Sequence, residues 1–173
     1  AVSSPNKHKN FPNLIDAFLK SNVDLDLKII GSLSNAFNDQ TSLVNNDPRI
    51  KFLGRVGDQE LVEVYQNAKF FIFPSLYEGF GIPIIEAMKT KCPVIAFKNS
   101  SIPEVAGKCG LLYDEESANS LVDGILKLRN VELREKLVME GVKQAEKFNW
   151  DKTAEKYLQF YKGLSAKKCK SVF

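Results

Sequence analysis

The chain has 173 residues, 44% of them hydrophobic and 26% charged, a balance typical of one globular domain large enough for a real core. The net charge of +3 is too small to argue for nucleic acid, and no basic run has interleaved aromatic residues. No apolar stretch approaches the ~18 residues of a membrane span. The three cysteines lack metal-ligand spacing and read as free thiols, so we expect a soluble cytoplasmic protein.

Predicted strands and helices alternate along most of the chain. The opening residues, Ala-Val-Ser-Ser, look like the end of a strand already under way, which suggests an excised part of something longer. Apolar runs without alternation are typical of strands buried on both faces. We therefore expect an α/β fold, a Rossmann-like, doubly wound parallel sheet. The predicted strands are 27–31, 50–54, 69–74, 93–97 and 110–114, and the predicted helices are 10–20, 39–46, 58–67, 82–90, 102–106 and 117–129.

Two further helices, 131–147 and 150–163, are predicted after the last strand. Asn149 is the expected N-cap of the second one. We expect Trp150 and Tyr157 to anchor these C-terminal helices. The domain is expected to span 1–165, and the tail 166–173 is expected to be disordered.

Ligands of an open parallel sheet bind in the loops at the carboxyl ends of the strands. This rule selects the loops after the opening strand and after the strands at 27–31, 50–54 and 69–74. The last of these loops, Ser-Leu-Tyr-Glu-Gly-Phe-Gly-Ile-Pro-Ile-Ile-Glu-Ala, carries two acids and two glycines.

The chemistry of residues 75–87 indicates a ligand site. Pro83 suits the first turn of a helix, whose free amides attract an anion such as phosphate. The two glycines let the backbone approach a ligand closely. Glu78 and Glu86 would repel phosphate but accept hydrogen bonds from the vicinal hydroxyls of sugars and riboses. A diphosphate between two sugar rings, as in a nucleotide sugar, would use every part of the loop.

Two other interpretations of this loop stay open. One is a plain turn followed by a solvated helix face, on which Glu86 pairs with Lys89. The other is the carboxylate pair of a glycoside hydrolase. Those acids usually come from separate elements, whereas Glu78 and Glu86 belong to one strand–helix crossover.

Four segments, "PSLYEGFGIPIIEAM", "PVIAFKNSSIPEVAG", "GLLYD" and "FNWDKTAEKYLQFY", resemble in this order the C-terminal half of retaining family 4 glycosyltransferases of the GT-B fold. The match runs from residue 2 to 163. Its key motif is a pair of glutamates separated by seven residues around Gly-Phe-Gly. The sequence of residues 78–107 is most similar to that of bacterial O-antigen mannosyltransferases, which favours GDP-mannose as the donor.

The resemblance implies a role for each residue of the motif. Glu78 would hold hydroxyls of the transferred sugar, and Glu86 would bind the nucleotide ribose. Lys9, in "HKNF", would face the diphosphate and stabilise the charge that grows on it as it leaves, which makes Glu78 and Lys9 the predicted catalytic residues. The segment between the two glutamates would line the sugar and phosphate pocket: Gly79, Phe80, Gly81 and Ile82.

The resemblance implies that the other selected loops bind the donor as well. Gly31 would line the floor of the pocket, and Val56, with Asp58, would meet the base edge. Many family members have an arginine six residues before the lysine, where this chain has Ser3. Ser3 or Ser4 would then donate through a hydroxyl or an amide. Three residues are weaker candidates. A solvated role explains Arg55, the substitute cation, and His8 as well, and the start of a short helix explains Glu104.

The resemblance implies a donor-binding domain of an enzyme that transfers a sugar, with retention, to a glycan or lipid-linked acceptor. The N-terminal acceptor domain of the GT-B fold is missing, so the isolated domain is expected to be inactive. No metal cofactor and no nucleic acid is expected, and peripheral association of the full-length enzyme with the inner face of the membrane stays open. A non-catalytic nucleotide-sugar-binding module and a GT-B epimerase are the rival classes.

Overall fold

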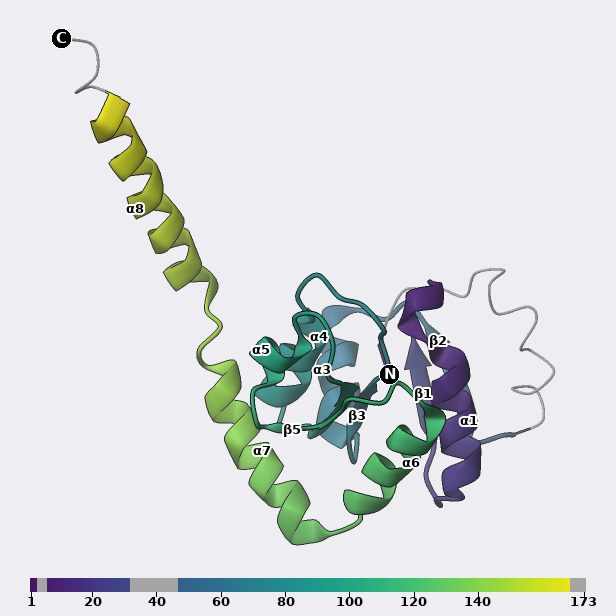
Figure 1. The fold of residues 1–173 in the computed structure, drawn as a ribbon. Coiled ribbons are helices and arrows are strands. Elements are labelled where there is room, and N and C mark those ends of the chain that lie inside the picture. The colour runs from purple at the N-terminus through teal and green to yellow at the C-terminus, as the bar shows by residue number, and fades with distance from the viewer. Residues whose placement is uncertain (3–5, 32–46, 169–173) are drawn as a thin grey trace.

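The computed structural model describes residues 1–2, 6–31 and 47–168 (Figure 1). Helices and strands alternate in them as the apolar pattern predicts. The strands are β1 (Leu27–Ile30), β2 (Ile50–Gly54), β3 (Phe71–Phe73), β4 (Val94–Phe97) and β5 (Gly110–Tyr113). The helices are η1 (Lys7–Lys9), α1 (Phe11–Ser21), α3 (Asp58–Asn67), α4 (Ile82–Lys89), α5 (Ile102–Ala106), α6 (Ala118–Lys127), α7 (Val131–Ala145) and α8 (Trp150–Lys168). The predicted helix 39–46 lies outside the described residues.

Every pair of described strands is parallel, and the strands form two hydrogen-bonded groups, β1–β2 and β3–β4–β5. The predicted opening strand contributes one parallel bridge, between Val2 and Ile30, among the described residues. This bridge joins the opening residues to the β1–β2 group.

Helices cover both faces of these strands, which is the doubly wound arrangement. In β4, Ile95 and Phe97 pack in a core with α1 and α6, whereas Val94 and Ala96 pack in a second core with α3, α4 and α5. All four side chains are fully buried. Burial on both faces explains the continuous apolar run of the sequence.

The two C-terminal helices behave differently. Helix α7 packs against α4, whereas α8 extends away from the body of the domain (Figure 1). The side-chain oxygen of Asn149 accepts hydrogen bonds from the amides of Asp151 and Lys152 at 2.8 and 3.2 Å, which confirms the predicted cap.

The predicted anchoring by Trp150 and Tyr157 is wrong for this chain. These side chains are 79% and 60% exposed, because α8 has no surface of the domain beneath it. The helix also continues to Lys168, past the predicted end at 163 and into the expected tail. No helix within the described ranges is long and apolar enough to cross a membrane.

Candidate functional site

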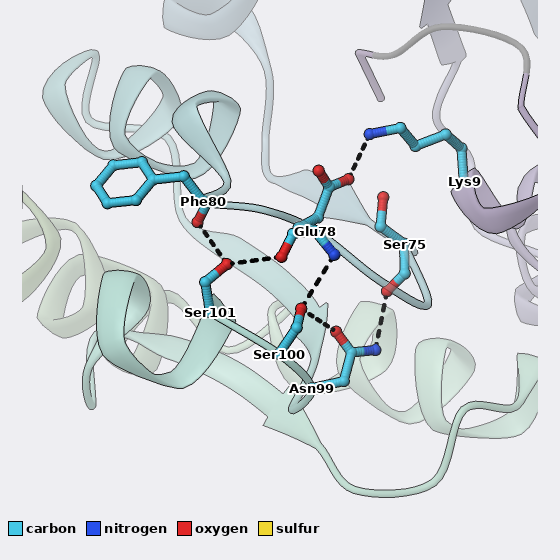
Figure 2. Close-up of polar contacts among 7 residues, drawn as sticks. All are labelled: Lys9, Ser75, Glu78, Phe80, Asn99, Ser100 and Ser101. Carbon is cyan, nitrogen blue, oxygen red and sulfur yellow. Dashed lines mark hydrogen bonds and ion pairs between the residues drawn. The ribbon is translucent and has the colours of Figure 1, made fainter.

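An ion pair between Lys9 and Glu78 forms the centre of the candidate site (Figure 2). The Lys9 ammonium donates to Oε1 of Glu78 at 2.5 Å, and the two side chains are only 14% and 12% exposed. Removing one partner of such a shielded pair leaves the other charge uncompensated, which costs more than losing a surface contact. The structure thus brings together the two predicted catalytic residues, from positions 69 residues apart in the chain.

Local backbone geometry places Lys9. The residue ends the short helix η1, and Asn10 follows it in the left-handed conformation at φ 55°. Asparagine tolerates this conformation better than most residues with a side chain. The carbonyl of His8 accepts a hydrogen bond from the amide of Leu76 at 2.7 Å, which ties η1 to the loop after β3. The Lys9 ammonium also lies 5.9 Å from the centre of the Phe73 ring.

The helix after the Gly-Phe-Gly step begins as the proline predicts. Gly81 is the N-cap, at φ 98°, and Pro83 lies in the first turn. The N-cap glycine has no side chain with which to cap α4, so among the described residues the positive end of the helix is open toward the loop that carries Glu78.

Glu86 lies one turn inside α4, where its carboxylate accepts a hydrogen bond from the hydroxyl of Tyr65 at 3.3 Å. Burial raises the pKa of this tyrosine, and the neighbouring Glu86 carboxylate adds to the effect. Glu86 is half-buried and bonded to α3, in place of the surface pair with Lys89 that the plain-turn interpretation requires.

A second loop, Asn99 to Ser101 after β4, holds the backbone of the site (Figure 2). The Ser100 hydroxyl accepts from the amide of Glu78 at 3.0 Å, and the Ser101 hydroxyl donates to the carbonyls of Glu78 and Phe80 at 3.2 and 2.9 Å. The four loops selected from the sequence leave this one out. Its position at the carboxyl end of β4 is the signal that could have found it.

The remaining predicted residues lie in the neighbouring loops. Gly31, directly after β1, donates its amide to the carbonyl of Gly54 at 2.8 Å, so the loops after β1 and β2 begin side by side. Val56 is partly buried, whereas Arg55 and Asp58 are exposed, with Asp58 at the start of α3. Among the described residues, none of these three forms a hydrogen bond or ion pair with Lys9 or Glu78. Ser3 and Ser4 lie outside the described residues.

The other residues of the motif have distinct surroundings. Gly79 is exposed, and Ile82 is 45% exposed at the first position of α4. The ring of Phe80 packs edge-on against Phe148, with ring centres 5.7 Å apart. Phe148 lies between α7 and α8, so the Gly-Phe-Gly segment contacts the connection between the C-terminal helices. The weaker candidates His8 and Glu104 are both exposed.

Other features of the domain lie away from this site. A cavity of about 290 Å³ between β1 and β3 contains none of the predicted site residues in its lining. Among the described side chains, no group of three or more His, Cys, Asp or Glu residues could hold a metal ion. Cys92 and Cys109 are free thiols, as the sequence predicts.

Parallel strands with helices on both faces, and a polar site at their carboxyl ends, define a doubly wound, Rossmann-like domain. The chain belongs to the family described as "Glycosyl transferases group 1", whose model matches residues 1–148. It is 38% identical over 116 residues, 66% of its length, to the O-antigen chain mannosyltransferase B of Escherichia coli. The match covers 30% of that relative, so the chain spans less than a third of its length.

Solved structures agree with this assignment. A sucrose-phosphate synthase from Thermosynechococcus elongatus superposes with a TM-score of 0.83 at 25% identity, over 95% of this chain and 45% of that one. The C-terminal domain of a glycosyl transferase group 1 family protein from Francisella tularensis gives a TM-score of 0.72 at 25% identity. That match covers 84% of this chain and 83% of the other.

Proposed function

We propose that this domain binds the nucleoside-diphosphate sugar of a glycosyltransferase that transfers the sugar with retention. The observation that carries the proposal is the shielded Lys9–Glu78 pair beside the uncapped start of α4. It places a cation, a helix N-terminus and a hydroxyl acceptor in one loop cluster. These are the groups that a diphosphate joined to a sugar requires.

When the donor binds, Lys9 and Glu78 exchange each other for partners on the donor. The Lys9 ammonium moves from the carboxylate to the diphosphate, and Glu78 accepts hydrogen bonds from sugar hydroxyls. Lys9 and the open end of α4 stabilise the negative charge that develops on the leaving diphosphate. Glu86, held by Tyr65, accepts from the ribose hydroxyls.

The finer assignments rest on the relatives. The name of the Escherichia coli relative, an O-antigen chain mannosyltransferase, supports mannose as the sugar. GDP-mannose as the donor and a glycan or lipid-linked acceptor are our proposals from the sequence resemblance. We assign the acceptor to an N-terminal domain outside these 173 residues. This chain alone is then expected to bind the donor weakly and to transfer nothing.

Calorimetric titration of the 173-residue chain with GDP-, UDP- and ADP-sugars tests donor binding. The expected result is heat with one of the three. A circular dichroism spectrum of a folded protein, together with no heat from any donor, overturns the proposal.

Two variants separate the roles within the pair. Lys9→Met is expected to lower the affinity for the nucleoside diphosphate and for its sugar conjugate alike, because both carry the diphosphate. Glu78→Gln is expected to weaken only the sugar conjugate, by about 10- to 100-fold, the worth of one or two charge-assisted hydrogen bonds. Lys98→Met, which removes the exposed pair with Asp114, is the matched control and should leave both affinities unchanged.

The proposed catalytic role requires the full-length enzyme. Glu78→Ala is expected to depress sugar transfer strongly there, because the sugar hydroxyls lose their acceptor. Transfer near the wild-type rate would show that Glu78 does not hold the sugar.

A further inference from the structure

The backbone at Gly79, directly after Glu78, has no packing from the described residues to hold it. A Cβ placed on Gly79 would meet no atom within 4 Å, so this residue is not confined by its surroundings. Glycine also has more backbone freedom than any other residue. A carboxylate on such a segment points in a fixed direction only if something else fixes the backbone.

The hydroxyls of Ser100 and Ser101 bind the backbone of Glu78 on both sides. Ser100 Oγ accepts from its N–H at 3.0 Å, and Ser101 Oγ donates to its C=O at 3.2 Å. The single proton of Ser101 is shared with the carbonyl of Phe80 at 2.9 Å. Figure 2 shows both hydroxyls directed at the Glu78 loop from one neighbouring loop.

The loop that supplies these hydroxyls is itself fixed. The side-chain amide of Asn99 donates to the Ser75 carbonyl at 3.0 Å and to the Glu116 carboxylate at 2.7 Å. Ser100 is in the left-handed conformation at φ 41°. Ser101 then starts α5, whose first residue, Ile102, is fully buried. The hydroxyls are therefore held between the buried first residue of α5 and the loop after β3.

We infer that Ser101, with Ser100, is the positioning residue of the donor site: it fixes the Glu78 backbone and so aims the carboxylate at the sugar. The inference rests on the proposed function. Neither serine needs to touch the donor. Their effect is preorganisation, because a backbone that is already ordered pays no further entropy when the sugar binds.

The test measures the affinity for the nucleoside diphosphate and for its sugar conjugate separately. Ser101→Ala is expected to lower the affinity for the sugar conjugate about three- to tenfold, the net worth of one hydrogen bond. The affinity for the diphosphate alone should stay within about twofold, because Lys9 and α4 remain in place. Ser101→Thr keeps the hydroxyl and should restore most of the sugar affinity.

A matched control is Ser117→Ala. Ser117, like Ser101, lies at the N-cap position of a helix, and its hydroxyl accepts from the Ser120 amide at 3.2 Å at the start of α6. This variant should lower the thermal midpoint, since a cap is lost, but leave both affinities unchanged. If Ser101→Ala lowers both affinities in parallel with stability, or lowers neither, the positioning role is wrong.

Hydrogen exchange provides a readout that needs no ligand. Ser101→Ala is expected to speed amide exchange in residues 76–81, and Ser117→Ala is not. If the wild-type chain binds no donor, the proposed function fails while this measurement still decides the role of Ser101. Unchanged exchange in 76–81 would show that the hydroxyl does not fix the segment.

Discussion

Substituting Gly81 with alanine tests how the motif builds the turn before α4. Gly81 has φ 98°, and a Cβ there would lie 3.0 Å from Cδ1 of Ile102, which is fully buried. The left-handed backbone costs an L-residue about 1–2 kcal/mol. Displacing a packed methyl adds roughly 1–3 kcal/mol. Alanine also makes the unfolded chain less flexible than glycine does, which offsets about 0.4–1 kcal/mol of this loss in stability.

The expected loss for Gly81→Ala is thus about 1–5 kcal/mol of unfolding free energy. Urea denaturation followed by circular dichroism would show it as a midpoint lowered by roughly 0.5–2.5 M, for a slope of about 2 kcal/mol per M. Gly79→Ala is the matched control in the same motif. Its Cβ would meet nothing within 4 Å and its φ is not positive, so stability should change by less than about 1 kcal/mol.

The two contributions can be separated. Ile102→Val removes the methyl group that the new Cβ would contact, so Gly81→Ala in this background should cost only the backbone contribution of about 1–2 kcal/mol. An equal cost in both backgrounds would refute the steric part of the reasoning. A neutral Gly81→Ala, or a Gly79→Ala that destabilises as much, would refute all of it.

Three further outcomes are expected. Gly124→Ala should lower stability by about 1–3 kcal/mol despite better helix propensity, since its Cβ would lie 2.8 Å from a β4 side chain; a gain in denaturation midpoint would contradict this packing. The side-chain hydrogen bond from Arg49 lowers the pKa of Asp47 from 3.8 to about 2, so the carboxylate stabilises the fold above pH 3.8 and loses this effect as the pH falls toward 2. Asp47→Asn should therefore lower the urea midpoint at pH 7 and converge with wild type near pH 2, and a pH-independent difference would count against the pair. Burial raises the pKa of Cys92 to about 12, so with the other two cysteines replaced by serine a thiol reagent should label it only as the protein opens; fast labelling of the native protein would contradict its burial.

The fold was largely predictable because its central strands, β3 and β4, are buried on both faces. A run such as Val94–Phe97, with every side chain buried, appears in the sequence as an uninterrupted apolar segment. The surroundings of α8 were not predictable in this way. Its apolar pattern indicates that one face can be covered, but not what covers it, and Trp150 is exposed here.

The site was predictable in part. The two glutamates and Lys9 could be found from loop position and family resemblance, since their chemistry is visible in their residue types. The serines at 100 and 101 could not. Ser100 binds the amide of a residue 22 positions earlier, and this contact depends on how two loops approach each other and not on any local pattern. The donor-binding roles of Lys9, the two glutamates and the two serines all remain predictions.

The Lys9–Glu78 pair has a consequence for selectivity. In the unliganded domain the cation is already neutralised by an internal carboxylate, so an incoming anion must compete with Glu78. An inorganic phosphate or chloride ion would gain the lysine but leave a shielded carboxylate without a partner, at a cost of several kcal/mol. Under the proposed function, a ligand with hydroxyl donors close to its negative charge satisfies both groups, so we expect the pair to select the donor against small anions.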